Sequence, residues 1–205
     1  MVKRILIIVA AVVLLAGIAF AVFFFVIRPR SNSFEDVTKD DFFYDAVKWA
    51  VKEGVAGGTY DKHFSPNEIC TRGQAMTFLW RASGSPTPSD TANPFPDVSD
   101  DMYYRDAILW ALERGITGGT DEGGFWPDGP ITRGQAVVFL YRAIGSPNVT
   151  ADLSFDDVSP DDYYEAAVRW ATEAEITTGV SETTFAPHQK CSRGQMLTFL
   201  YRCFG

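Results

Sequence analysis

Residues 71–82 read TRGQAMTFLWRA, and the pattern returns as TRGQAVVFLYRA at residues 132–143 and as SRGQMLTFLYRC at residues 192–203. Apolar side chains recur in each copy at the three- and four-residue spacing of one helix face. A Ser or Thr followed three residues later by Gln forms a capping box, the pattern that begins a helix. The sequence therefore predicts the same short helix three times, each beginning at its Ser or Thr.

The repetition extends well beyond this helix. Three units align without a gap: residues 34–84, 95–145 and 155–205. Each unit is expected to form a helix, a glycine turn, a loop and a second helix. In the first unit, Asp40 and Asp41 are expected to open the first helix, because acidic side chains suit a helix start, and Gly54 is expected to end it.

A pair of helices this small cannot bury its own apolar face, so the three units are expected to share one core. The fold class that we expect is all-α, built from three helix-loop-helix repeats. The connectors between them are rich in Ser, Thr, Pro and Asn and are expected to be short and extended. The predicted divisions are an N-terminal segment, a first repeat, and two further repeats that each follow a connector: residues 1–30, 31–84, 85–145 and 146–205.

The N-terminal segment contains an unbroken apolar run at residues 5–27. As a helix this run would be about 34 Å long, enough to cross a bilayer. Lys3 and Arg4 precede it, as they would in a signal peptide, and an A-x-A-like cleavage site ends at Ala21. An uncleaved transmembrane anchor is the preferred interpretation, because cleavage there would leave the apolar residues 22–27 at the new terminus.

The rest of the chain is strongly acidic. The formal net charge is −8, and four of the basic residues, Lys3, Arg4, Arg28 and Arg30, lie in the first 30 residues. General attraction to nucleic acid is therefore excluded. An anionic ligand would have to be bound by a few individually placed cations.

The three cysteines, Cys70, Cys191 and Cys203, have neither metal-site spacing nor the density of a disulfide-rich domain. We expect them to be small buried hydrophobic residues, and we expect no metal ion or cofactor. Cys70 and Cys191 occupy equivalent repeat positions, so a disulfide between them is possible but cannot be deduced from the sequence.

Each unit carries an F-x-D-V motif, an aromatic pair, an aromatic residue two before a proline, and an S/T-R-x-x box. In the first unit these motifs lie at residues 34–37, 42–43, 64–66 and 71–74, with A-V at 46–47 and G-x-x-x-G at 54–58. The chain resembles the S-layer homology family over everything beyond the apolar segment. The resemblance implies that three repeats close into a pseudo-threefold spindle, and that grooves between neighbouring repeats bind secondary cell-wall polysaccharide, often bearing pyruvate ketals. The family's usual T-R-A-E box reads T-R-G-Q here, so an amide replaces the acid.

Arg72, Arg133 and Arg193 directly follow the helix cap. A cation at the positive end of a helix dipole is unfavourable by about 0.3–1 kcal/mol, so three copies of this choice need a reason. In one interpretation the guanidinium and the free amides of the helix start bind a carboxylate or phosphate. In the other, the arginines form internal salt bridges with the motif aspartates: Asp36, Asp97 and Asp157.

Loop glycines and one set of aromatic residues complete the candidate binding residues. The glycines follow the first helix, and the turn itself is an alternative reason for them: Gly57, Gly58, Gly118, Gly119 and Gly179. The aromatic residues at the start of the first helix are expected to line the grooves: Phe42, Tyr103 and Tyr163. Trp49, Trp110 and Trp170 follow the helical period and are expected in the core. Glu175 and Thr178 replace glycines in the third repeat, so a third groove, with Arg193, is expected to be degenerate.

Nothing in the sequence nominates a catalytic site. The two histidines, His63 and His188, lie at non-equivalent loop positions, and no cysteine has a partner at a recognisable spacing. The function that we expect is therefore non-catalytic binding of an anionic cell-wall polysaccharide, outside the membrane that residues 5–27 span. The alternative is a membrane-proximal module for protein–protein contact or self-association, without a glycan ligand.

The apolar run generates the first prediction. The native protein should remain membrane-bound with residues 5–27 intact, because this run is longer than the apolar core of a signal peptide. Intact-mass measurement of the protein from its own membrane checks this. A mature chain that starts at Val22 would contradict the anchor.

Overall fold

The computed structural model describes residues 34–150, 152–153 and 155–205. The apolar run at residues 5–27, and with it the predicted transmembrane anchor, lies outside the described residues. None of the helices in the described part of the chain has the length and apolar character needed to cross a bilayer. Residues Phe34–Gly205 form one compact unit.

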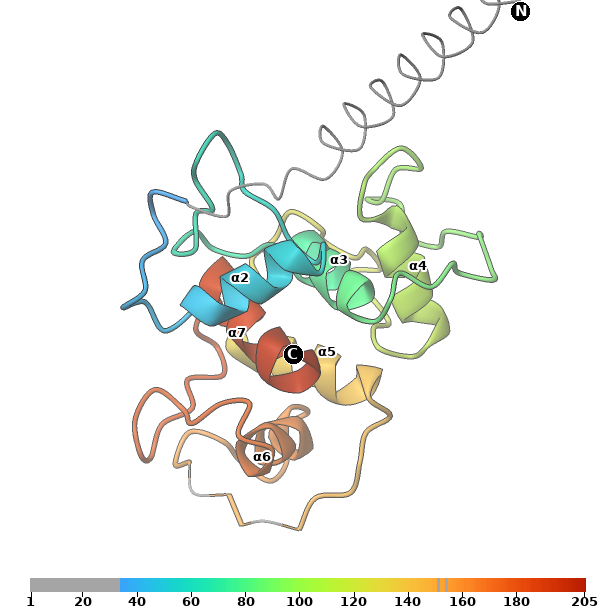
Figure 1. Ribbon diagram of the computed structural model, residues 1–205. Coiled ribbons are helices and arrows are strands. Elements are labelled where there is room, and N and C mark those ends of the chain that lie inside the picture. Colours follow the sequence, from blue (N-terminus) through green and yellow to red (C-terminus); the bar gives the residue numbers. More distant parts are fainter. Residues whose placement is uncertain (1–33, 151, 154) are drawn as a thin grey trace, which may run out of the picture. The chain divides into compact units, whose positions relative to one another are not determined.

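The described residues form helices and loops, with isolated β-bridges but no strand. This agrees with the predicted all-α class. The first helices of the three repeats are α2 (Tyr44–Lys52), α4 (Arg105–Glu113) and α6 (Glu165–Glu173). The second helices are α3 (Arg72–Ala82), α5 (Arg133–Ala143) and α7 (Arg193–Phe204) (Figure 1).

The three predicted capping boxes are confirmed. The Thr71 hydroxyl accepts a hydrogen bond from the Gln74 amide at 3.2 Å, and the Thr71 amide donates to Gln74 Oε1 at 3.2 Å. Thr132 with Gln135 and Ser192 with Gln195 form the same pair of bonds. Each box gives a hydrogen-bond acceptor to the amide of the third helical residue, which has no partner within the helix. The capping box therefore determines the residue at which each helix begins.

The predicted start of the first helix is wrong by a few residues. Helix α2 begins at Tyr44, and Asp41 instead accepts hydrogen bonds from the amide and hydroxyl of Thr38 at 2.7 and 3.0 Å. Asp41 therefore closes a local turn before the helix, a role for which short acidic side chains are equally suited. The predicted stop is confirmed, because Gly54 has φ 72° directly after the helix cap.

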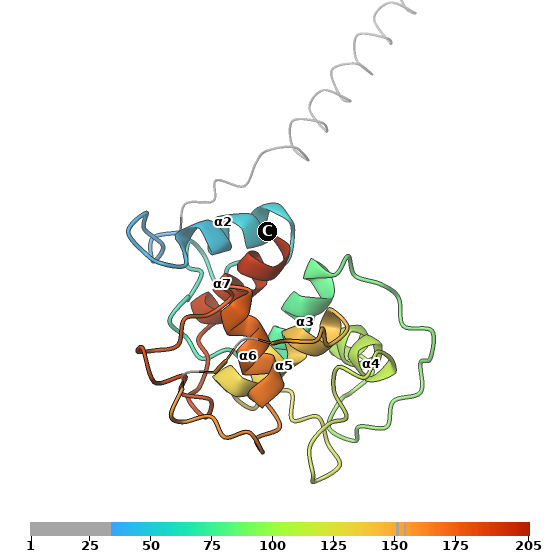
Figure 2. The same cartoon turned by 90° about the horizontal axis from the view of Figure 1, so that it is seen from below.

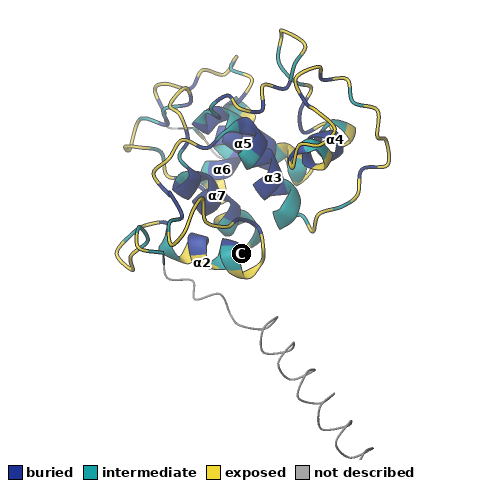
Figure 3. Ribbon diagram, turned by 90° about the horizontal axis from the view of Figure 1, so that it is seen from above, coloured by how far each residue is buried: buried dark blue, intermediate teal, exposed yellow. Residues whose placement is uncertain are grey.

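Each first helix packs on the second helix of the preceding repeat. Helix α4 packs on α3, and α6 packs on α5. Helix α2 packs on α7, so the first repeat completes the last one (Figures 1 and 2). The second helices α3, α5 and α7 also contact one another, and the most buried parts of the ribbon lie along them (Figure 3).

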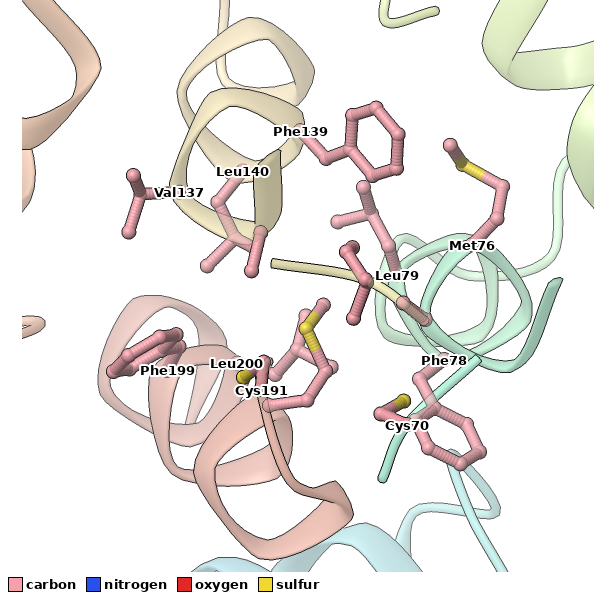
Figure 4. Close-up of a cluster of buried hydrophobic side chains, with 14 of the residues drawn as sticks. Cys70, Met76, Phe78, Leu79, Val137, Phe139, Leu140, Cys191, Phe199 and Leu200 are labelled. Atoms are coloured by element: carbon pink, nitrogen blue, oxygen red, sulfur yellow. The ribbon is translucent and has the colours of Figure 1, made fainter. Parts of the chain in front are cut away.

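The shared core lies where the three second helices meet. Leu79, Leu140 and Leu200 belong to the same buried cluster as Cys70 and Cys191 (Figure 4). Both cysteines are free thiols, and burial raises the pKa of Cys191 to about 12. The predicted packing role of the cysteines is confirmed for Cys70 and Cys191.

A closed triangle of backbone hydrogen bonds joins the residues that precede the three caps. The amide of Cys70 donates to the carbonyl of Cys191 at 2.9 Å, and the amide of Cys191 donates to the carbonyl of Ile131 at 2.9 Å. The amide of Ile131 donates to the carbonyl of Cys70 at 3.0 Å, which closes the triangle. Every repeat is thus bonded to both others at the centre of the core.

A glycine in the first turn of each second helix allows the next repeat to approach closely. A Cβ atom at Gly73 would lie 2.9 Å from Tyr104 Cδ1 and 3.1 Å from the Pro127 carbonyl oxygen. At Gly194 a Cβ would lie 2.8 Å from Phe43 Cδ1. These glycines are therefore explained by tight packing between repeats, one of the ways in which a helical glycine offsets its cost.

Replacement of Gly73 tests this packing. Alanine is favoured over glycine in a helix by about 1 kcal/mol, but a methyl group forced against a backbone carbonyl costs about 1–3 kcal/mol. We therefore expect Gly73→Ala to lower the free energy of unfolding by up to about 2 kcal/mol in urea titrations. Gly118→Ala is the control, because a Cβ there has no neighbour within 4 Å. Equal stability of the two variants would contradict the packing role.

Candidate functional site

Arg72 is buried against the next repeat. Its side chain is 3% exposed, and Nε donates a hydrogen bond to the Phe125 carbonyl oxygen at 2.9 Å. The guanidinium carbon lies 4.8 Å from the ring centre of Phe125 and 5.5 Å from that of Phe139. The cation is thus held between two phenyl rings of the second repeat, where desolvation strengthens cation–π attraction.

The other two arginines have the same environment. Arg133 Nε donates to the Phe185 carbonyl at 3.0 Å and contacts the rings of Phe185 and Phe199. Arg193 Nε donates to the Phe64 carbonyl at 3.3 Å and contacts the rings of Phe64 and Phe78, so it joins the third repeat to the first. Each arginine therefore links its own repeat to the next one around the core. Sequence analysis missed this role, because it weighed an anionic ligand and the motif aspartates as partners of the arginines and not the phenyl rings of the next repeat.

The motif aspartates do not form salt bridges with these arginines. Asp97 accepts hydrogen bonds from the amides of Phe125 and Trp126 at 2.9 and 2.6 Å. Asp36 and Asp157 bind the equivalent amides of their own repeats. Among the residues that the structure describes, no ion pair within 4.0 Å involves Arg72, Arg133 or Arg193. The salt-bridge interpretation is therefore wrong, and the aspartates instead shape the loops that receive the arginines.

The helix-start amides are also occupied. The Arg72 amide donates to the Gly129 carbonyl at 2.9 Å, and the Gly73 amide donates to the Pro127 carbonyl at 2.8 Å. The equivalent bonds of the other helices join Arg133 to Gln189, Gly134 to Pro187, Arg193 to Glu68 and Gly194 to Pro66. The expectation that free amides at these helix starts help to bind an anion is wrong. Of the proposed anion ligands at these helix starts, only the guanidinium groups remain as candidates.

The terminal guanidinium nitrogens differ among the three copies. Arg193 Nη2 donates to the Gly57 carbonyl at 3.1 Å, and Arg133 Nη2 makes a longer bond to Thr177 Oγ1 at 3.4 Å. Arg72 has no acceptor for its terminal nitrogens among the described residues. In the same part of the chain, Trp110 Nε1 is the buried side-chain polar atom that lacks a partner, so the Arg72 nitrogens are not sealed from solvent.

Three exposed aromatic rings precede the first helices, and two of them are coupled electrostatically to an arginine. Phe42, Tyr103 and Tyr163 are 66%, 59% and 64% exposed. Desolvation raises the pKa of Tyr163 and of Tyr103, and a smaller electrostatic effect, from Arg72 on Tyr163 and from Arg193 on Tyr103, acts in the opposite direction. We call Arg72 together with Phe125, Phe139 and Tyr163 the Arg72 site. It combines residues of all three repeats.

Burial lowers the pKa of Arg72, and the neighbouring Tyr163 and Asp97 partly offset this effect. The ordinary value is high enough for the guanidinium to stay charged. The Arg72 site is therefore a buried permanent cation without a paired anion, and its two terminal nitrogens have no acceptor among the described residues. Such a group binds a planar carboxylate through parallel hydrogen bonds.

Comparison with known proteins identifies the repeat. The family model of the S-layer homology domain matches residues 33–76, 94–137 and 154–197, which together exceed half of the chain. The chain belongs to the S-layer homology family. The expected resemblance is thereby confirmed.

The relatives of this S-layer homology chain are larger surface proteins and enzymes. It is 24% identical to an S-layer protein of Bacillus thuringiensis subsp. finitimus, over 85% of this chain and 21% of that protein. It is 31% identical to an endoglucanase of Bacillus sp. (strain KSM-635), over 82% of this chain and 18% of the enzyme. The chain thus spans about a fifth of the length of these relatives.

The loop glycines of the S-layer homology repeats fall into two groups. At Gly58, Gly119 and Gly179, an added Cβ would meet a ring of the F-x-D-V phenylalanine at 2.9, 2.6 and 2.6 Å. Packing therefore requires these three glycines. Gly57 and Gly118 are exposed, with open space at the Cβ position. A ligand-binding role for any of the five remains a prediction.

The expected degeneracy of the third site was assigned to the wrong arginine. The loop of the third repeat, with Thr177 and Phe185, receives Arg133, whereas Arg193 contacts the first repeat. Glu175 adopts the left-handed conformation of the glycine that it replaces, with φ 56°. Any weakness caused by Glu175 and Thr178 therefore belongs to the site of Arg133.

One tryptophan recurs in the first helix of each repeat. Trp110 and Trp170 are buried, at 5% and 8% exposure, and Trp49 packs against the same core. Their predicted packing role is confirmed. Sequence analysis did not select Trp126, which is 56% exposed and lies in the loop that receives Arg72. The available signal was that the equivalent residues, Ser65 and Ala186, are small.

Removal of the Arg72 side chain should destabilise the protein. Arg72→Ala leaves a gap between Phe125 and Phe139 and removes the donor to the Phe125 carbonyl, so we expect a loss of about 2–4 kcal/mol in the free energy of unfolding. The helix dipole alone would predict the opposite, a slightly higher stability once the cation is removed from the helix start. Thermal and urea melts measure it, and the exposed Arg114→Ala is the control. A melting temperature equal to that of the wild type would show that the ring contacts contribute nothing.

Proposed function

We propose that this chain binds an anionic secondary polysaccharide of the cell wall without catalysing a reaction. The observation that carries the proposal is the Arg72 guanidinium, which is buried, has no ion-pair partner and has no acceptor for its two terminal nitrogens among the described residues. Membership of the S-layer homology family supports a surface role. Relatives named as S-layer proteins and a cell surface protein support a place in the cell envelope.

The kind of acidic group that the site would bind follows from the arginine. A guanidinium offers two parallel N–H donors that match a carboxylate, such as that of a pyruvate ketal on a sugar. The Phe125 and Phe139 rings contact the cation, and the site is buried, which strengthens a charge-assisted hydrogen bond. Tyr103 and Tyr163 supply exposed rings and hydroxyl groups beside Arg193 and Arg72, whereas Phe42 supplies only a ring.

The net negative charge of the chain affects which anionic polymers it can bind. With a net charge of −8, the chain repels a polyanion at long range. Binding must therefore come from short-range contacts at the arginines, which favours a polymer whose acidic groups fit the sites over any polymer that is merely charged.

The arrangement that we propose is a pseudo-threefold spindle outside the cytoplasmic membrane, with residues 5–27 as a single transmembrane helix. The closed packing of α2 on α7 supports the spindle. The protein would then link membrane to wall. The matched parts of the endoglucanase and amylopullulanase relatives cover 18% and 6% of those enzymes, so the proposal carries no hydrolase activity to this chain.

Co-sedimentation with isolated cell walls tests the function. The complete chain, kept in detergent micelles, should bind walls of its own organism and lose that binding when the walls are stripped of secondary polysaccharide with acid. Rising salt should weaken binding, because charge–charge attraction is screened. Equal binding to stripped walls would exclude the polysaccharide. Reversible self-association in sedimentation velocity, without wall binding, would instead favour the protein–protein alternative.

A conservative substitution tests whether Arg72 binds a carboxylate through two parallel hydrogen bonds. Arg72→Lys keeps the charge, but an ammonium group cannot bond the Phe125 carbonyl and also grip a carboxylate through parallel bonds, so we expect binding to weaken about tenfold. Arg114→Lys is the matched control and should bind like the wild type. Thermal melts of both variants separate lost affinity from lost folding. Wild-type affinity in a folded Arg72→Lys variant would remove Arg72 from the site.

A further inference from the structure

Trp126 is an exposed indole held in a strained conformation. The residue has φ 60°, in the left-handed region that bulky side chains avoid, and it is 56% exposed. The equivalent residues of the other repeats, Ser65 and Ala186, both have φ 58°. The loop therefore demands this conformation everywhere, and only the second repeat places a large apolar side chain there. The indole must gain something that offsets the cost of strain and exposure.

A second substitution accompanies the tryptophan. A Cβ atom at Gly129 would lie 2.2 Å from Cδ2 and 2.4 Å from Cε2 of Trp126, so the indole lies directly on this glycine. Gly129 does not have a left-handed φ, so the backbone does not require glycine. The other repeats have Glu68 and Gln189 at this position. Glycine is needed at 129 because the indole occupies the space of a side chain.

The loop that carries the indole is bonded to Arg72 through its backbone. The Phe125 carbonyl, which forms the peptide bond to Trp126, accepts the hydrogen bond from Arg72 Nε at 2.9 Å. The Gly129 carbonyl accepts the hydrogen bond from the Arg72 amide at 2.9 Å. Asp97 holds the Trp126 amide at 2.6 Å. Two hydrogen bonds from Arg72 therefore hold the loop that carries the indole against the start of α3, and Asp97 anchors the same loop within its own repeat.

The same arginine is the copy whose terminal nitrogens have no acceptor among the described residues, whereas Arg133 and Arg193 each use one. The arginine whose terminal nitrogens lack an acceptor, Arg72, is thus also the one whose partner loop carries an exposed indole. Neither feature is repeated at the other two.

We propose that Trp126 is a sugar-stacking subsite beside Arg72, which receives the apolar face of the pyranose ring next to the acidic sugar that Arg72 binds. The proposal rests on the proposed function. Indole is rigid and presents a large apolar face at little cost in conformational entropy, and packing on Gly129 orders it before the ligand arrives. The Arg72 site is therefore the principal site of the three.

Calorimetric titration with polysaccharide released by mild acid from walls of the protein's own organism tests the subsite. We expect Trp126→Ala, in the complete detergent-solubilised chain, to bind about tenfold more weakly than the wild type. Its melting temperature should be unchanged or higher, because alanine occupies the same backbone conformation at Ala186. Tyr60→Ala removes an exposed ring of the first repeat, outside the contacts of Arg72, and should not affect the Arg72 site.

A transfer of the subsite provides the converse test. The double variant Ala186→Trp, Gln189→Gly gives the third repeat the same pair of residues beside Arg133 and should strengthen binding severalfold. Unchanged or tighter binding by Trp126→Ala, while Arg72→Lys weakens binding, would overturn the subsite and leave the proposed function intact. Absence of binding by the wild type would overturn both.

Discussion

Each second helix begins with a guanidinium held between two phenyl rings of the next repeat, and the rest of the fold depends on this contact. Arg72 joins the first repeat to the second, Arg133 the second to the third, and Arg193 the third to the first. The hydrogen bond to a backbone carbonyl satisfies one donor, and the rings replace part of the lost hydration. The carbonyl is presented by a loop that an aspartate anchors through two backbone amides. Arginine, aspartate and F-x-P loop are therefore one structural unit.

This dependence joins stability to the candidate site. The cation that holds neighbouring repeats together is the same cation that would bind an acidic sugar. A helix-start glycine brings the buried aromatic residue of the next repeat against the helix, and in two of the three cases the exposed neighbour of that residue is coupled electrostatically to an arginine. The binding sites would thus arise from closure of the repeats, and a single isolated repeat would have none of them.

The sequence predicted local structure well because capping boxes and glycine stops depend on residues close together in the chain. Thr71 with Gln74 and the stop at Gly54 are of this kind. Helical periodicity identified the apolar faces but not their partners, so it did not predict that α2 packs on α7. The arginine environment was missed because a dipole argument concerns one helix, whereas the phenyl rings come from another repeat. Trp126 was missed because it breaks the repeat, and alignment of the copies draws attention to what they share.

The contact between α2 and α7 also has a mechanical consequence. In an open array, a tensile load can separate repeats one after another, and each rupture is small. Here the first helix of the array completes the last repeat, and the triangle of bonds through Cys70, Ile131 and Cys191 joins all three at the centre. A load applied at any one site is distributed over two interfaces from the outset. Removal of any one repeat therefore requires two interfaces to break together, so the three repeats should resist a load as one unit.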